Sequence, residues 1–262
     1  MYEFKAMLTM DTLIWAIDNN YSEQPDDEEF IHLKTYPIDK DMFNVDLNNW
    51  MIEINQHLIP KWFDPGRAEQ EMQKMLKEIF DSRYIVNEDA FMINKGRWFI
   101  KNSGIDATKM AELYCYGESS VTCGDYCRVS AYDKTRVFSF DSCAIKQYDE
   151  SSSMAHDRCH IKAYDTSTVN AYNMCIAELN DRCVCIAYDN TRIVAGGCSR
   201  VDALRHSYIT ASEYCSVKLK DYAILVASDR VQVEASGRNY IDIKNGSNVI
   251  TDKIDSEVII RR

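Results

Sequence analysis

The sequence lacks the features that mark secretion, membrane insertion and phosphate binding. Its first twenty residues carry charges throughout and show no basic-plus-apolar leader, so we expect no secretion signal. No apolar run approaches the roughly 20 residues that a membrane-spanning helix needs. The ten cysteines contain no CxxC pair, and no glycine loop suited to phosphate is present. We therefore expect a cytoplasmic protein with reduced cysteines and without a bound metal or other cofactor.

The charge is acidic and unevenly distributed. Residues 1–104 hold 19 acidic and 11 basic side chains, a balance of −8, and the remainder holds 22 and 19, a balance of −3, which together give the net charge of −11. A basic stripe with interleaved aromatic residues is missing, so direct binding to DNA or RNA is not expected. A protein that imitates DNA would need its negative charge arrayed along a rod, which the repeated aspartates could supply, although a role in turns explains them as well.

An eight-residue repeat organises the chain from residue 113 to about residue 250. Blocks such as VSAYDKTR from Val129, IKAYDTST from Ile161 and CIAYDNTR from Cys185 share the formula Val/Ile–x–Ala–Tyr/Ser–Asp/Gly–x–Cys/Ser/Thr–x. The seventh, first and third positions lie two residues apart, which places their small apolar side chains on one face of a strand. Aspartate, asparagine or glycine at the fifth position marks a corner. Strands that alternate with corners at a fixed short period predict a parallel β-solenoid.

The length of one coil follows from the spacing of two residue types. Two octads would give a coil of 16 residues and three octads a coil of 24. Cysteines recur every 16 residues, at 127, 143, 159 and 175, and tyrosines do the same at 116, 132, 148 and 164. A 16-residue coil would stack each type into a ladder, so we favour two octads per coil. Most cysteines then fill inward positions as small apolar groups.

The octad frame resembles the repeats of bacterial ice-nucleation proteins. In those proteins Gly-Tyr-Gly/Asp-Ser-Thr occupies the places held here by Ala-Tyr-Asp-x-Thr. The frame is also similar to octad-repeat proteins of unknown function from gut bacteria and their phages. The resemblance covers residues 113–250 and implies the solenoid fold. Ice binding is not expected, because the outward positions are mixed rather than regular Thr-x-Thr arrays.

Residues 1–104 predict a separate, acidic α+β cap domain. The clearest element is a helix from Pro65 to about Ser82, with Asp64 as N-cap and an apolar stripe of Met72, Met75, Leu76 and Ile79. Residues 9–18 suit either a short helix or a strand, residues 22–29 form an acidic loop, and a strand near residues 48–56 precedes a turn at Pro60. Residues 83–104 predict two strands. We assign the solenoid to 105–250 and a second cap, which pairs over the last coil, to 251–262.

The outward positions supply the candidate binding residues. With 16-residue coils, one wall carries a basic cluster on its early coils, formed by Arg128, Lys146, Arg158, His160 and Lys162. Apolar residues follow on later coils of this wall: Met174, Ile176, Val194, Tyr208, Ile224 and Val226. An exposed apolar patch indicates contact with another part of the chain or with another protein molecule. The cap domain, a second copy in a homodimer and a foreign protein all remain possible occupants, and the basic cluster alone is also compatible with a solvated face.

Enzymatic chemistry finds little support in the sequence. His156 and His160 form the one close histidine pair, but the octad places His156 at a corner and His160 on an outward strand position. We therefore predict no catalytic residues. The leading expectation is a non-enzymatic protein-interaction module, with a phage-borne inhibitor of a host defence or nucleic-acid enzyme as its specific form. The alternative is a structural component of a phage particle or homo-assembly.

Overall fold

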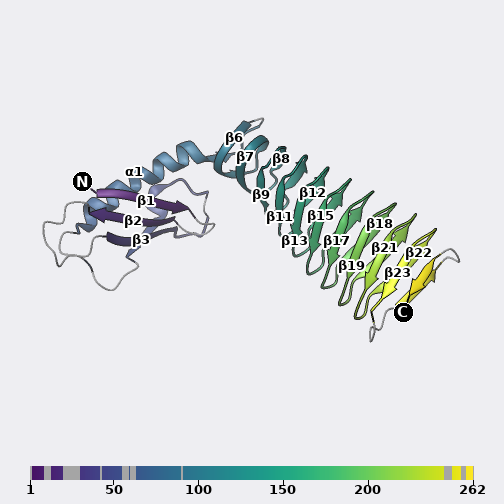
Figure 1. Ribbon diagram of the computed structural model, residues 1–262. Coiled ribbons are helices and arrows are strands. Elements are labelled where there is room, and N and C mark those ends of the chain that lie inside the picture. The colour runs from purple at the N-terminus through teal and green to yellow at the C-terminus, as the bar shows by residue number, and fades with distance from the viewer. Residues whose placement is uncertain are drawn as a thin grey trace. The chain divides into compact units, whose positions relative to one another are not determined.

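The computed structural model describes residues 2–8, 13–19, 30–41, 43–54, 59, 63–89, 91–244, 250–254 and 258–261. The chain divides into two compact units, Met1–Tyr84 and Ile85–Arg262. Figure 1 shows a small sheet and a helix in the first unit, and a long stack of short strands in the second. The mainly β architecture with a parallel solenoid and a small α+β region confirms the predicted fold class.

The first unit contains an antiparallel sheet in the order β1-β2-β3-β4. Its strands are β1 (Tyr2–Leu8), β2 (Leu13–Asn19), β3 (Phe30–Pro37) and β4 (Trp50–Ile54), and the short 3-10 helix η1 (Leu47–Asn49) leads into β4. The ambiguous segment 9–18 is thus a strand from Leu13 onward. The expected acidic loop 22–29 and the turn at Pro60 lie outside the described residues.

Helix α1 (Pro65–Arg83) begins where the sequence predicts. The carboxylate of Asp64 accepts hydrogen bonds from the backbone N–H groups of Gly66 and Arg67, at 3.0 and 3.2 Å, which satisfies two otherwise unpaired donors. The buried helix face joins the side chain of Trp50 in one apolar cluster: Ala68, Met72, Leu76 and Phe80. This cluster is the core of the first unit.

The solenoid begins earlier than the octad formula indicates. Strand β5 (Tyr84–Val86) precedes β6 (Phe91–Lys101), which pairs in parallel with β7 (Gly104–Tyr116). Ile93 and Ile100 are buried in the same continuous core as the later coils. The boundary between the two compact units therefore falls at Tyr84 rather than at Gly104. Long strands without the corner aspartate conceal this first coil in the sequence.

Two parallel walls of short strands make up the rest of the unit. Wall 1 contains β9 (Arg128–Ala131), β11 (Ala144–Gln147), β13 (His160–Ala163), β15 (Ile176–Leu179), β17 (Arg192–Ala195), β19 (Tyr208–Ala211), β21 (Ile224–Ala227), β23 (Tyr240–Ile243) and β25 (Ile259–Arg261). Wall 2 contains β8 (Ser120–Cys123), β10 (Arg136–Ser139), β12 (Ser152–Ala155), β14 (Thr168–Ala171), β16 (Val184–Ala187), β18 (Arg200–Leu204), β20 (Ser216–Lys220), β22 (Gln232–Ser236) and β24 (Ile250–Ile254).

The strand register confirms a coil of two octads. In wall 1 Ala144 pairs with both Arg128 and His160, so successive strands are offset by 16 residues. The C-terminal strands extend the two walls, because β24 pairs with β22 and β25 pairs with β23, although the offsets there are 18 and 19 residues. The segment expected to pair over the last coil therefore adds strands to both walls.

The inward positions of the octad form a thin core of mostly small side chains. Burial alternates as predicted along the three consecutive strands β9, β10 and β11: Val129 and Ala131, Val137 and Ser139, Ile145 and Gln147 are all buried. The seventh positions are buried as well, and the four cysteines of the predicted ladder lie there: Cys127, Cys143, Cys159 and Cys175. Side chains this small allow the two walls to approach closely.

The fifth position of each octad has a left-handed backbone. Asp133, Asp149 and Asp165 have φ angles of 53°, 56° and 57°, a region that aspartate tolerates better than most residues. Each carboxylate also accepts a hydrogen bond from the backbone one coil earlier: Asp149 from the N–H of Asp133 at 3.1 Å, and Asp165 from that of Asp149 at 3.2 Å. The corner aspartates thus connect neighbouring coils.

Aromatic ladders run along both edges of the solenoid. On the edge that leads from wall 1 to wall 2, Tyr116, Tyr132, Tyr148 and Tyr164 stack with ring centroids 4.7, 4.9 and 5.1 Å apart, which confirms the predicted tyrosine ladder. On the opposite edge a second ladder stacks four rings of three residue types: Phe140, His156, Tyr172 and Tyr188. Stacking along both edges adds to the cohesion between coils.

Candidate interaction surface

Wall 1 presents two outward columns of side chains, from the first and third residues of each strand. Because neighbouring strands are in register, each column places one residue above another at about 4.8 Å intervals. Nine of the eleven residues predicted on this wall do lie on it: Arg128, Lys146, His160, Lys162, Ile176, Val194, Tyr208, Ile224 and Val226.

Two predicted members lie elsewhere. Arg158 and Met174 follow the left-handed residues Asp157 and Asn173, so both occupy the corner edge that leads from wall 2 into wall 1. The error arises because the sixth octad position belongs to the corner and does not point from the wall. Both side chains are exposed beside wall 1. They border the surface without forming part of it.

The early coils of wall 1 form a basic section, defined here as Arg128, Lys146, His160 and Lys162. All four side chains are exposed. The ammonium of Lys162 lies 2.7 Å from the carboxylate of Glu178 on the next coil, and this contact raises the pKa of the lysine. Only one of the three permanent cations is therefore offset by a described partner on this wall. The section keeps an excess of positive charge on an acidic protein.

The late coils of wall 1 form an apolar section, defined here as Tyr208, Ile224, Val226, Tyr240 and Ile259. The residues of the first column lie on four successive strands, because Tyr208 pairs with Ile224, Ile224 with Tyr240, and Tyr240 with Ile259. The exposed fractions of Tyr208, Ile224 and Ile259 are 40%, 39% and 64%. Side chains of this kind on adjacent coils make a continuous apolar strip.

Wall 2 offers an internal comparison, because it has the same backbone and the same octad. Its large apolar residues with high exposure are Phe138 on β10 and Val184 on β16, which are separated by two intervening strands of that wall, β12 and β14. Its other outward residues include the half-buried Met154 and Ile186 among polar and charged types, for example Arg200 beside Asp202 and Lys218 paired with Glu234 at 3.0 Å. The basic and apolar sections are thus specific to wall 1.

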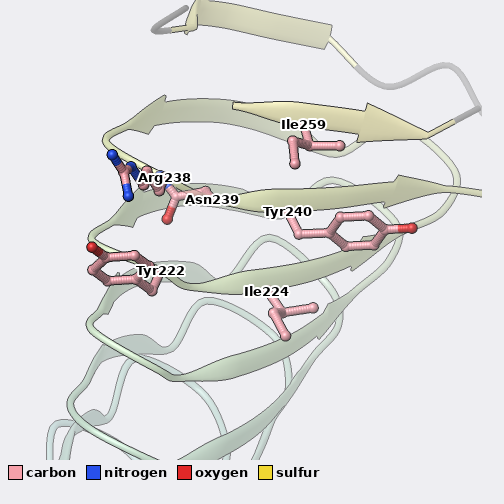
Figure 2. Close-up of a pocket in the computed structure, with 6 residues that line it drawn as sticks. All are labelled: Tyr222, Ile224, Arg238, Asn239, Tyr240 and Ile259. Carbon is pink, nitrogen blue, oxygen red and sulfur yellow. The ribbon is translucent and has the colours of Figure 1, made fainter. Parts of the chain in front are cut away.

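A shallow hollow of about 450 Å³ lies at the late end of the apolar section. Six residues line it: Tyr222, Ile224, Arg238, Asn239, Tyr240 and Ile259. Figure 2 shows Ile224, Tyr240 and Ile259 on successive strands, with Tyr222 and Arg238 on the corner side. Tyr222, Arg238, Tyr240 and Ile259 were not among the residues predicted from the sequence.

The two histidines do not converge on one site. His156 is stacked between Phe140 and Tyr172, at centroid distances of 5.4 and 4.5 Å, whereas His160 points outward from wall 1. Within the described residues, no three histidine, cysteine or carboxylate side chains are grouped so that they could hold a metal ion. No helix in the described part of the chain is long and apolar enough to cross a membrane.

Comparison of the chain with protein-family models, with curated proteins and with solved structures finds no match.

Proposed function

We propose that this protein is a non-enzymatic interaction module that binds a partner protein along wall 1. The observation that carries the proposal is the uneven surface of this wall, which has cations on its early coils and, beyond the exposed Arg192, mainly large apolar residues in the first outward column of its late coils. A complementary partner would offer carboxylates to Lys146 and Lys162 and apolar side chains to Tyr208 and Ile224. Complementary charge would fix the register of the partner, and apolar contact would supply most of the affinity.

The gradient of wall 1 disfavours self-association through this surface. A two-fold dimer with parallel solenoids would place Lys146 and Lys162 against the same cations of the second copy. A two-fold dimer with antiparallel solenoids would place these cations against the apolar section. Like charges repel in the first arrangement, and the second buries charge without a partner. A different protein with an acidic and an apolar region avoids both penalties.

The area of wall 1 sets the expected strength of binding. Four coils at about 4.8 Å and strands of four residues at about 3.3 Å give the apolar section an area of roughly 250 Å². Stable complexes bury about 800 Å² per partner. The basic section and the intervening coils raise the available area to about 500 Å², which is typical of transient complexes. We therefore expect an affinity in the micromolar range.

The class of the partner is proposed from the resemblance to octad proteins of gut bacteria and their phages. On this basis the partner is a host defence protein or a nucleic-acid enzyme, and the chain is its inhibitor. The exposed corner carboxylates of Asp133, Asp149, Asp165 and Asp181 form an uninterrupted row, which a basic nucleic-acid channel could also meet. The hydrogen bonds of these aspartates to the backbone account for the row independently, so wall 1 carries the proposal.

A second candidate function rests on the exposed end of the solenoid. Ile260 occupies the inward column of wall 1, where Ile241 and Leu225 are fully buried, but 36% of it is exposed. Strand β25 therefore offers apolar surface at the end of the rod, which favours end-to-end contact in a homo-assembly. Light-scattering mass distinguishes the two functions, because a structural component would be a large homo-oligomer and an interaction module a monomer or small oligomer.

Affinity capture from a lysate of the source organism tests the interaction module. Ile224→Asp places a charge in the apolar section, and Val184→Asp makes a matched change on wall 2, where the exposed fraction of the residue is also 39%. We expect one stoichiometric partner that is retained by Val184→Asp and lost with Ile224→Asp. Lys146→Glu combined with Lys162→Glu should also release it, and Arg136→Glu on wall 2 should not. A partner that survives all wall 1 changes would contradict the proposal.

A further inference from the structure

The second aromatic ladder ends at a glycine. Its rings come from the fourth octad position of four successive coils: Phe140, His156, Tyr172 and Tyr188. Gly124 holds this position one coil before Phe140, since the strands that lead into the two corners, β8 and β10, pair in register. One face of the Phe140 ring lies against His156, at a centroid distance of 5.4 Å. The other face is therefore on the side of a residue that has no side chain.

The exposure of Phe140 indicates that this second face is open. Phe140 is 42% exposed, whereas every other ring in the two ladders is half-buried. A methyl group built at Gly124 would have one described atom within 4 Å apart from its chain neighbours, a carboxylate oxygen of Asp141 at 3.2 Å. We call the place of the missing side chain the open ladder position.

The open ladder position has room for one planar ring. Thr108 holds the fourth octad position on the coil before Gly124, because β7 and β8 pair in register. Coils repeat at about 4.8 Å, so Thr108 and Phe140 are separated by about 10 Å along the edge. The rings of the ladder stack at centroid distances of 4.5 to 5.4 Å. One additional ring would therefore fill this interval and contact Phe140 at the spacing of the ladder.

Exposed apolar side chains surround the open ladder position. Tyr126 lies two residues after Gly124 at the same corner, and Phe138 lies two residues before Phe140 on the outward face of β10. Met110 holds the octad position of Tyr126 one coil earlier. The exposed fractions of Tyr126, Phe138 and Met110 are 69%, 39% and 75%. A single ring would leave these groups in water, so the apolar surface suits a longer ligand.

We propose that the open ladder position binds the aromatic side chain of a tyrosine, phenylalanine or tryptophan in a segment of another protein. The ring stacks on the open face of Phe140, and its neighbours in the segment contact Tyr126 and Phe138. Stacked rings attract each other beyond the effect of buried area. The net charge of −11 disfavours a nucleic acid as the source of the ring. This site lies on the edge of the solenoid and goes beyond the function proposed for wall 1.

A ring supplied by the chain itself tests whether the position accepts one. The φ angle of Gly124 lies outside the left-handed region, so a side chain there causes no backbone strain. Gly124→Tyr should extend the ladder and raise the unfolding midpoint by about 2–4 °C. Calorimetry of the full-length protein measures this shift.

Gly196→Tyr is the matched control on the opposite edge. Gly196 also holds the fourth octad position, and its N–H donates to a carbonyl one coil earlier at 3.0 Å, as that of Gly124 does. Its neighbours along the edge are Asn180 and Ser212, which offer no ring. This control reports the backbone effect of replacing glycine, and it should raise the midpoint by less than half as much.

Two small probes test binding to the wild-type protein. N-acetylphenylalanine amide and N-acetylcyclohexylalanine amide are similar in size, and only the first has a planar aromatic ring. In an NMR titration the aromatic probe should shift the ring protons of Phe140 upfield, with an affinity of roughly millimolar order. It should bind roughly two- to tenfold more tightly than the saturated probe. N-acetyl-Leu-Phe-Leu-amide should bind more tightly than either, because its leucines reach Tyr126 and Phe138.

The variants assign the binding to the open ladder position. Gly124→Tyr should abolish binding of the aromatic probe, since the new side chain occupies the position, and Gly196→Tyr should leave it unchanged. Phe140→Leu should remove the preference for the aromatic over the saturated probe. Far-ultraviolet circular dichroism checks that each variant is folded.

Several results would overturn the proposal. Equal midpoint shifts for the two tyrosine variants would show that the ladder does not accept a ring at Gly124. Absence of shifts at Phe140, equal affinity for the two probes, or binding that persists in Gly124→Tyr would exclude the site. A tripeptide that binds no more tightly than the aromatic probe would point to a free aromatic molecule. Tighter binding of adenosine monophosphate than of the tripeptide would point to a nucleic acid.

Discussion

The inward and outward positions of the octads follow different rules. Along the inward first column of wall 1, the residues are of one kind and all buried, from Val129 through Ile161 to Ile241. Along the outward column beside it, the residues change from Arg128 to His160 to Ile224. Inward regularity is required because every coil must stack on the next. Outward variation is free of that requirement, so the departures from the repeat carry the information about binding.

The largest expected loss of stability comes from truncating an inward residue, and truncation of an outward residue on the same wall provides the comparison. Ile161→Ala should lower the free energy of unfolding by about 2–5 kcal/mol, because it leaves a cavity in a thin core. Ile176→Ala, on the outward face of the neighbouring strand of wall 1, should cost less than about 1 kcal/mol. Urea denaturation followed by circular dichroism measures both. Equal losses would show that the two columns do not differ in their structural role.

A corner aspartate should show an intermediate effect. Asp165→Ala removes the acceptor for the N–H of Asp149 and places alanine in a left-handed conformation, at a combined cost of about 1–3 kcal/mol. Asp165→Asn keeps an acceptor oxygen and tolerates this backbone, so it should lose less than half as much. The same denaturation experiment compares the two variants. If Asp165→Asn lost more than half as much stability as Asp165→Ala, the negative charge, rather than the hydrogen bond, would be what stabilises the corner.

Alkaline pH should weaken the interior selectively. Burial raises the pKa of the Cys215 thiol to about 11. Since this pKa is raised above that of the unfolded chain, near 9, the thiol contributes stability fully below about pH 9 and loses it as pH rises through 11. The loss is at most about 3 kcal/mol. Cys215→Ala should reduce the fall in stability over this range, and the exposed Cys198→Ala should leave the fall unchanged.

The smallest effect on stability should come from chemical modification of an outward thiol. Among the ten free cysteines, Cys198 is exposed and the others are buried. A thiol-reactive reagent should therefore modify one cysteine rapidly in the native protein and ten after denaturation, as counted by mass spectrometry. Modification at Cys198 should not change the unfolding midpoint. Rapid labelling of the native Cys198→Ser variant would contradict the burial of the other nine cysteines.

The repetitive part of the fold could be predicted because identical requirements return at identical intervals. The 16-residue coil was evident from Cys143 and Cys159 and from Tyr132 and Tyr148. The second aromatic ladder was missed, since Phe140, His156 and Tyr172 are three residue types with one geometric role. The first coil was missed because residues 91–101 form a long strand without the corner aspartate.

The candidate site was predicted in part. Wall residues such as Lys162 and Ile224 follow directly from octad counting. Ile259 could not be found in this way, because it pairs with Tyr240 across 19 residues instead of 16. Arg158 was assigned to the wall although it belongs to a corner. The hollow depends on corner residues lying next to wall residues, and a linear repeat does not reveal that proximity.

The bonds of the corner aspartates give the rod a direction of assembly. The N–H of Asp133 finds its acceptor in Asp149, and that of Asp149 in Asp165, so each corner is completed by a residue synthesised later. A growing chain that leaves the ribosome therefore always ends in one incomplete coil, which the next 16 residues complete. A chain interrupted within the repeats would therefore keep an unfinished corner at its end.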